Sequence, residues 1–112
     1  MEINVNGNTY TLHFGIGFVR HLNSVAGVSV EGMDMGMALQ KTLPALAAGD
    51  PAALADVIYA AAQNKANRKK LTADEIEDWL DGDADLTKLF EDVTTEIKES
   101  NSTKTAAKNL LP

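Results

Sequence analysis

The sequence predicts a mainly helical α+β domain, in which an N-terminal β-hairpin packs on about five helices. Over residues 2–13, apolar residues alternate with polar ones, which is the period of a strand with one buried face. From residue 16 onward, apolar residues recur instead at the spacing of amphipathic helices. Because two strands alone are marginal in water, we expect the hairpin to lie against the helices, a further strand or another molecule.

The hairpin is predicted from its turn as well as from its alternation. Asn6, Gly7 and Asn8 are residue types that a tight hairpin turn requires, since they tolerate positive φ angles. If Val28 and Val30 form a short strand after the first helix, the hairpin gains a third member. The apolar positions of the two strands are Ile3, Val5, Tyr10 and Leu12.

Glycine and proline set the limits of the first two helices. The first follows Gly15 and stops at Gly27, a natural helix end. Its predicted apolar face consists of Ile16, Val19, Leu22 and Ala26, widened by Phe18 and Val25. The second begins near Asp34 and continues to Ala47. Pro44 interrupts it, because proline lacks an N–H donor and its ring displaces the carbonyl of the preceding turn. The pattern is therefore compatible with a kinked helix or with two short ones.

Capping residues predict two further helices. Asp50 is suited to cap a helix that has Pro51 at its first position. The apolar stripe of this helix consists of Leu54, Val57, Ile58 and Ala61. Thr72 and Glu75 have the spacing of a capping box, and the helix that they start ends at Gly82. These signals are local, so they predict where each helix begins without any knowledge of the tertiary structure.

The last predicted helix and the C-terminal tail differ in composition. Asp83 or Asp85 caps this helix, whose apolar stripe extends to Ile97. The tail that follows is mostly polar and offers few large apolar side chains for burial. We therefore expect one domain over residues 1–100 and a flexible tail over residues 101–112.

Charge and composition disfavour several functions. The chain carries 16 acidic and 10 basic residues, and its net charge of −6 is the wrong sign for binding nucleic acid phosphates. It has no cysteine, which excludes disulfides and thiolate metal sites. No apolar run approaches the roughly 18 residues of a membrane helix, and the start MEINVNG lacks a signal-peptide pattern. We therefore expect a cytoplasmic protein that binds neither nucleic acid nor a membrane.

No residue pattern indicates catalysis or a bound cofactor. The stretch FGIGFVR lies between a strand and a helix, as a dinucleotide-binding loop does, but Arg20 stands where the third glycine is required. His13 and His21 have no second pair of ligands at metal spacing. The serines lack a nucleophile pattern, and the carboxylates are spread along helix faces. The sequence thus predicts a protein that is not an enzyme.

An acidic turn before the last helix has part of the pattern of a calcium loop. Asp81, Asp83 and Asp85 have the alternate spacing of calcium ligands, and Asp92 falls at the twelfth position of such a loop. Leu86 stands at the sixth position, where glycine is required, so capping of the last helix is the favoured interpretation. The alternative function that this turn suggests is a small acidic adaptor or a calcium-responsive protein-binding module.

A methionine-rich loop is a second candidate for partner binding. In GMDMGMAL, three methionines stand beside two glycines, and flexible thioether side chains suit a surface that adapts to an irregular apolar partner. The same side chains can equally fill a core at the start of a helix. Together with the hairpin, the candidate contact residues are Ile3, Val5, Tyr10, Leu12, Met33, Met35 and Met37.

In their order along the chain, these pieces resemble a family of phage proteins. They are the hairpin and first helix INVNGNTYTLHFGIGFVRHLN, the loop EGMDMGMAL, the helix GDPAALADVIYAAA, the capped segment LTADEIEDWLD and the closing DLTKLFEDVTTEIKES. Over residues 2–100, the chain resembles the tail assembly chaperones of long-tailed phages of Gram-positive hosts. The resemblance implies a protein of the host cytoplasm that coats the tape measure protein, keeps it soluble and is absent from the mature virion.

The resemblance also implies a longer product and self-association. A programmed minus-one frameshift near the end of the reading frame would add a C-terminal extension, through which the longer form recruits the tail tube protein. Ala107, Lys108 and Asn109 can be encoded as GCA AAA AAC, which contains a slippery heptanucleotide. We further expect the hairpin to present an edge or an apolar face to neighbouring copies, so that the domain assembles along its client.

Overall fold

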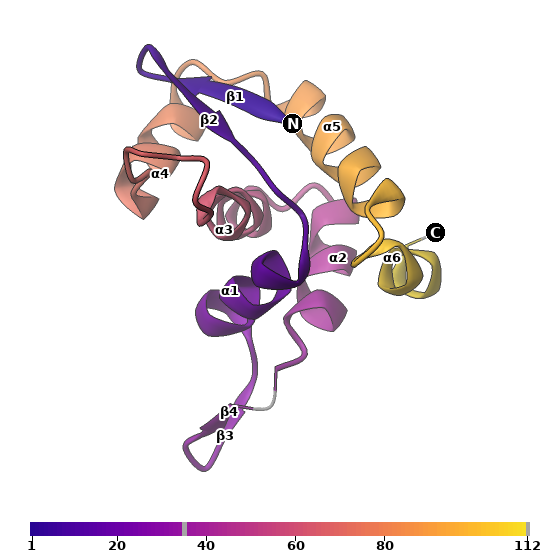
Figure 1. Ribbon diagram of the computed structural model, residues 1–112. Coiled ribbons are helices and arrows are strands. Elements are labelled where there is room, and N and C mark those ends of the chain that lie inside the picture. The colour runs from indigo at the N-terminus through magenta and orange to yellow at the C-terminus, as the bar shows by residue number, and fades with distance from the viewer. Residues whose placement is uncertain (35, 112) are drawn as a thin grey trace.

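Six helices and two β-ribbons form the described part of the chain, which comprises residues 1–34 and 36–111 of a computed structural model (Figure 1). In chain order the elements are β1 (Glu2–Val5), β2 (Asn8–Thr11), α1 (Ile16–Ala26), β3 (Ser29–Val30), β4 (Met33–Asp34), α2 (Ala38–Ala47), α3 (Pro51–Ala62), α4 (Ala73–Asp81), α5 (Leu86–Glu99) and α6 (Lys104–Leu110). The predicted mainly helical α+β class is confirmed. α3 packs against α1, α2 and α4, whereas α6 packs against α2 and α5. None of the described helices is long and apolar enough to cross a membrane.

The N-terminal hairpin forms as predicted. β1 and β2 pair antiparallel with Ile3 opposite Tyr10, and Asn6 and Gly7 join them at φ angles of 55° and 83°. Positive φ at both central positions gives the turn a twist that matches the flanking strands. The apolar side chains on one face of the hairpin join the same core as the helices.

Two asparagines that follow α3 hold the edge of β2. Asn67 Oδ1 accepts the N–H of Thr11 at 2.8 Å, and Asn67 Nδ2 donates to the carbonyls of Thr11 and Ala62 at 2.9 and 2.8 Å. Asn64 Nδ2 donates to the carbonyls of Thr11 and Ala61, both at 3.0 Å. These bonds pair backbone groups that an edge strand otherwise leaves to water, and they fix the hairpin to the end of α3.

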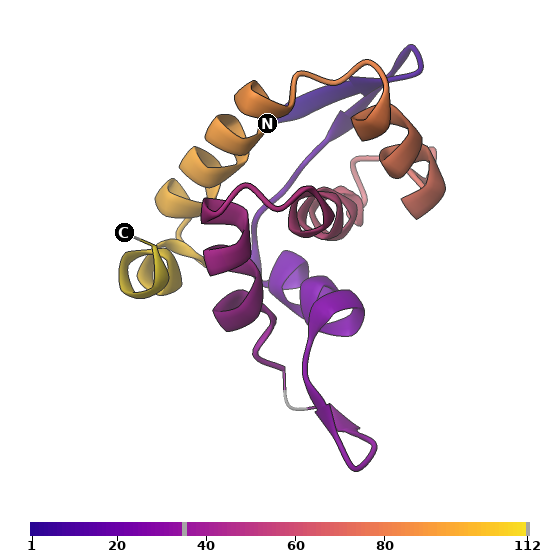
Figure 2. The same cartoon turned by 180° about the vertical axis from the view of Figure 1, so that it is seen from behind.

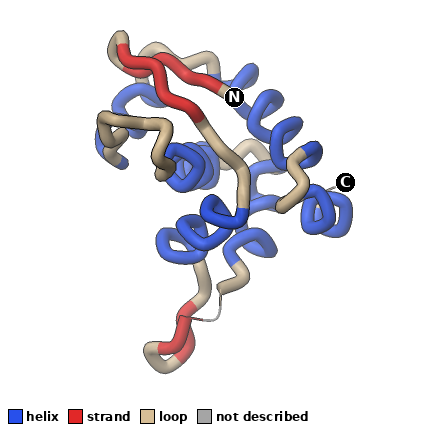
Figure 3. The backbone as a smooth tube through the Cα atoms, viewed as in Figure 1, coloured by secondary structure: helices blue, strands red, loops and turns tan. Residues whose placement is uncertain are grey.

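β3 and β4 form a separate ribbon that projects from the helical body (Figure 3). The short strand after α1 thus pairs with β4 and does not become a third member of the N-terminal hairpin. Glu31 and Gly32 join the two strands at φ angles of 52° and 78°, so a local two-residue turn determines the pairing. At the base of the ribbon, Asn23 Oδ1 accepts the N–H of Ala38 at 3.0 Å and so links α1 to the start of α2.

The predicted caps are confirmed at three helices. Asp50 Oδ1 accepts the N–H of Ala52 at 2.9 Å at the start of α3. Thr72 and Glu75 form the capping box of α4. Of the two candidate aspartates before α5, Asp85 is the cap. Each cap gives a partner to an N–H group that the first helical turn leaves unpaired.

α2 continues through Pro44 as one helix, which excludes the alternative of two short helices. Leu43 and Leu46, on either side of the proline, are 0% and 2% exposed. Proline removes one backbone hydrogen bond, but burial of these two side chains holds the helix against the core. Figure 2 shows α2 beside α3, α5 and α6.

α1 buries only part of the predicted apolar face. Phe18, Leu22 and Ala26 are buried, whereas Ile16 and Val25 are 64% and 45% exposed. The apolar pattern covers more of the helix than the core does, so the pattern alone did not show which positions are buried. Val25 lies at the surface beside α3.

Residues 104–110 form α6, in the segment where the sequence analysis expects a flexible tail. Thr103 is fully buried and its hydroxyl donates to the carbonyl of Ile97 at 2.6 Å, and Ala107 is 2% exposed. The anchors are small residues, whose burial a search for large apolar side chains overlooks. The end of the chain therefore packs on the body of the domain (Figure 2).

Candidate binding surface

A groove lies over one face of α3, between α1 and α4. Its floor is a stripe of α3 that consists of Ala52, Ala55, Asp56 and Tyr59. These positions are three or four residues apart, so they share one face of the helix. The opposite face of α3 contributes buried side chains to the core. Because two of the floor residues are alanines, the helix backbone lies close to the surface of the groove.

The two neighbouring helices supply the walls of this groove. Val25 of α1 forms one wall, and Ala73 and Glu77 of α4 form the other, around a hollow of about 350 Å³. An adjoining hollow of about 170 Å³ shares part of this lining and continues along α4 to Leu80 and Asp81. The two hollows together are called the α3 groove, and its lining residues are Val25, Pro51, Ala52, Ala55, Asp56, Tyr59, Ala73, Glu77, Leu80 and Asp81.

The α3 groove is apolar along its floor and acidic in charge. Burial raises the pKa of the Asp56 carboxyl; the positive charge of Lys41 opposes this shift, whereas the negative charges of Asp50 and Glu77 add to it. Asp56 is thus a partly desolvated carboxylate with two acidic neighbours. A cation placed in the groove would relieve both effects.

The hairpin residues predicted to contact a partner are buried within the domain. Ile3, Val5, Tyr10 and Leu12 are between 1% and 6% exposed and belong to the same core as the helices. This corrects the prediction that the apolar face of the hairpin is available to a partner of the folded protein. Alternation at period two shows that one face of a strand is buried, but it does not show what buries it.

The methionine candidates lie in and after the β3–β4 ribbon. Met37 is 51% exposed and has a φ angle of 65° at the start of α2. Met33 belongs to β4, and Met35 lies outside the described residues. Met37 is therefore the candidate whose side chain the structure shows at the surface.

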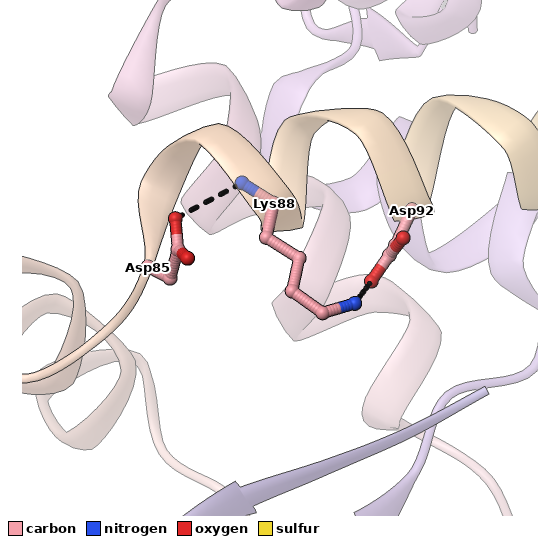
Figure 4. A network of polar contacts seen from close by, with 3 residues as sticks. All are labelled: Asp85, Lys88 and Asp92. Carbon is pink, nitrogen blue, oxygen red and sulfur yellow. Dashed lines mark hydrogen bonds and ion pairs between the residues drawn. The ribbon is translucent and has the colours of Figure 1, made fainter.

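The aspartates considered as calcium ligands include a helix cap and a member of an ion pair. Asp85 Oδ1 accepts the backbone N–H of Lys88 at 3.1 Å, and Asp92 Oδ2 lies 2.7 Å from Lys88 Nζ (Figure 4). The hydrogen bond and the charge of Asp92 raise the pKa of Lys88. Asp81 and Asp83 are exposed. Over residues 1–34 and 36–111, no group of three or more His, Cys, Asp or Glu side chains is placed to hold a metal ion.

Two further hollows are more open to solvent than the one beside Asp56. One lies between α2 and α5 beside the C-terminus, encloses about 410 Å³ and includes Phe90 and Leu111 in its lining. The other, of about 400 Å³, lies against the basic segment after α3 and includes Lys65 and Lys69.

The sequence analysis did not single out the α3 groove. It assigned Val25 to the inward face of α1, and in α3 it identified the stripe through Leu54, Val57 and Ile58, which is buried. The missed signal was a second apolar stripe on the same helix. A helix with apolar residues on most of its sides is expected to be covered by other elements on most of its sides. In α3, the side that carries Ala52 and Ala55 is left uncovered.

Comparison with known proteins identifies the family. The chain matches the family model described as "Phage tail assembly chaperone protein, TAC" over residues 2–111, which is nearly its whole length and includes α6. No curated protein and no solved structure matches the chain. The family has an assembly role instead of a catalytic one, and its partners are proteins of the tail assembly. The chain therefore belongs to the phage tail assembly chaperone family.

Proposed function

We propose that this protein binds the tape measure protein and keeps it soluble while the phage tail is assembled. The observation that carries the proposal is the family match over residues 2–111. A tape measure protein is long, helical and apolar, so it needs a partner that covers its surface before the tail tube forms around it. In this proposal the chaperone acts in the host cytoplasm and is released before the virion is complete.

The surface of the chain suits this role. Its net charge of −6 favours solubility of the coated client, because like-charged coats repel one another. Met37 is exposed and can adapt to an irregular apolar partner, and Met33 and Met35 remain proposed contacts. In this proposal, several copies associate along one client through the edge of the hairpin. The edge concerned is β1, because Asn64 and Asn67 cover the edge of β2.

A longer, frameshifted product is the second part of the proposal, and it recruits the tail tube protein. The codons for residues 107–109 fall within α6, so Thr103 and the core residues of the hairpin and of α1 to α5 precede the shift and are common to both products. Reading the gene at these codons tests the placement. An Ala107 codon that does not end in A, or AAG at Lys108, would exclude it.

Co-expression with the tape measure protein tests the main proposal. We expect a soluble complex with several copies of this chain per client, measured by size-exclusion chromatography with light scattering. An unrelated long coiled-coil protein of similar size is the matched control and should not co-elute. Recovery of an insoluble tape measure protein beside free chaperone would refute the proposal.

The release step has its own measurement. Mass spectrometry of purified virions should detect the tape measure protein and should not detect this chain. Its presence in virions at a fixed ratio to the tape measure protein would contradict release and would indicate a structural component of the tail.

A further inference from the structure

We propose that the α3 groove binds an amphipathic helix of another protein, in which a stripe of apolar residues is flanked by lysine or arginine. That the partner is the helical tape measure protein rests on the proposed function. That the partner helix is apolar and basic rests on the residues of the groove alone.

The shape of the groove fits a helix. Ala52, Ala55 and Tyr59 of α3 recur at the spacing of one helix face, and Ala73 and Glu77 of α4 recur in the same way. Small side chains allow an added helix to approach the backbone closely. An amphipathic helix that lays its apolar stripe between two others is a recurrent mode of recognition.

The charge of the groove determines which helix fits. Asp56, Glu77 and Asp81 line it, and within the described residues none of them forms an ion pair. Asp56 is half-buried among apolar side chains, where its carboxylate lacks part of its hydration and has Glu77 as an acidic neighbour. A lysine or arginine of the partner that reaches this carboxylate makes a charge-assisted hydrogen bond in a partly desolvated site.

A second copy of the chain fits the groove less well than another protein does. Two copies each carry a net charge of −6, so an acidic groove repels the partner copy at long range. The helices of this chain that have a basic residue and no acidic one are α1, α2 and α6, of which α1 and α2 pack on each other and on α3 inside the domain. Only α6 among these described helices has two lysines, Lys104 and Lys108. α6 is already packed on its own domain through Ala107, so it is not free to enter the groove of a neighbour.

A pair of designed peptides tests the inference on the intact chain. Each peptide is a helix of about 20 residues with one stripe of alanine and leucine, a length at which isolated helices form. One has lysine on both sides of the stripe, and the other has glutamate at the same positions. Binding to the isotope-labelled protein is followed by the shifts of its backbone amide NMR signals.

The expected result is saturable binding of the lysine peptide, with the largest shifts at Ala52, Ala55 and Ala73. The glutamate peptide should bind at least about tenfold more weakly, because like charges then meet in the groove. Asp56→Lys and Glu77→Lys should each weaken binding of the lysine peptide and strengthen binding of the glutamate peptide. Glu77 is exposed, so its variant keeps the test valid if Asp56→Lys fails to fold.

A matched control separates the groove from the overall charge. Glu99→Lys makes the same change in net charge on the exposed end of α5 and should leave the affinity for both peptides unchanged. Equal binding of the two peptides, shifts centred elsewhere, or no shifts at all would overturn the inference. Groove shifts that grow with protein concentration in the absence of peptide would also overturn it, because they would assign the groove to a second copy.

This test separates failure of the inference from failure of the proposed function. The peptide measurement does not use the tape measure protein, so its result stands whether or not that client is solubilised. If both proposals hold, Glu77→Lys should also reduce recovery of the soluble tape measure complex, whereas Glu99→Lys should not. If the complex is recovered at the wild-type level with Glu77→Lys, the groove does not contribute to binding of the tape measure protein.

Discussion

Asn67 joins two parts of the chain that are far apart in sequence. Its side chain makes three hydrogen bonds, to both backbone groups of Thr11 and to the carbonyl of Ala62. We predict that Asn67→Ala lowers the free energy of unfolding by about 1–3 kcal/mol, because it leaves the backbone N–H of Thr11 without a partner. The carbonyls of Thr11 and Ala62 keep hydrogen bonds from Asn64. Urea denaturation measures this change.

The matched control for this prediction is Asn101→Ala, at an exposed asparagine in the turn before α6. Its effect should stay within about 0.5 kcal/mol, as for surface substitutions in general. Hydrogen exchange should show faster exchange of the Thr11 amide in Asn67→Ala. Unchanged exchange at Thr11 would mean that water replaces the asparagine at no cost.

Asp56 should make stability depend on pH. Its pKa is raised in the folded state, so the charged carboxylate costs stability at neutral pH, and this cost disappears as the pH falls below the ordinary aspartate value of about 3.9. We predict that Asp56→Asn is more stable than the wild type at pH 7, by less than about 1 kcal/mol because solvent screens a half-buried charge. The advantage should vanish near pH 4.

Urea denaturation at a series of pH values measures that difference. Asp78→Asn, at an exposed position of α4 outside the groove, is the control. A wild type that is more stable than Asp56→Asn at pH 7 would show that Lys41 outweighs the burial of the carboxyl. In that case Asp56 would already have a sufficient counterion within its own chain.

Among the elements, α6 is preceded by a buried hydroxyl that adds a polar anchor to the packing of Ala107. Thr103 donates to the carbonyl of Ile97 and has no exposed surface. We predict that Thr103→Val, which keeps the shape but removes the donor, lowers the free energy of unfolding by about 1–3 kcal/mol. Amide hydrogen exchange across residues 104–110 should accelerate in this variant more than elsewhere.

Thr105→Val is the control for α6, because it makes the same substitution at an exposed position of the same helix. It should leave both stability and hydrogen exchange almost unchanged. If residues 104–110 exchange rapidly in the wild type, the flexible tail expected from the sequence is correct in solution. The position of α6 would then not constrain the longer product.

At the scale of the whole molecule, the features predicted from the sequence are those that depend on neighbours along the chain. The turn at Asn6 and Gly7 and the caps at Asp50 and Thr72 require no distant partner. The features that were missed depend on distant contacts. Which stripe of α1 is buried depends on α2 and α3, and the order of α6 depends on α2 and α5.

The candidate surface was missed for the same reason. The second stripe of α3 is visible in the sequence, but only the packing of α1 and α4 on α3 leaves this stripe uncovered as a groove. For the hairpin, the sequence correctly identified the apolar face but not the surface that covers it, and the prediction assigned this face to a partner. The radius of gyration of 13.3 Å is that of one compact domain of this length, about 13 Å. The helices of the same chain already bury the apolar face of the hairpin.

The β3–β4 ribbon has a practical consequence for experiments in cells. It projects from the body, and its turn residues Glu31 and Gly32 are exposed, so a short epitope or fluorescent label inserted between them sits outside the core. The N-terminus is a poor place for a tag, because the carbonyl of Met1 accepts the N–H of Leu12 at 2.7 Å. A C-terminal tag would interfere with the proposed longer product. A label in the ribbon thus leaves both ends native, and because Met33 is a proposed contact, loss of client binding in the labelled chain would place the ribbon in the contact surface.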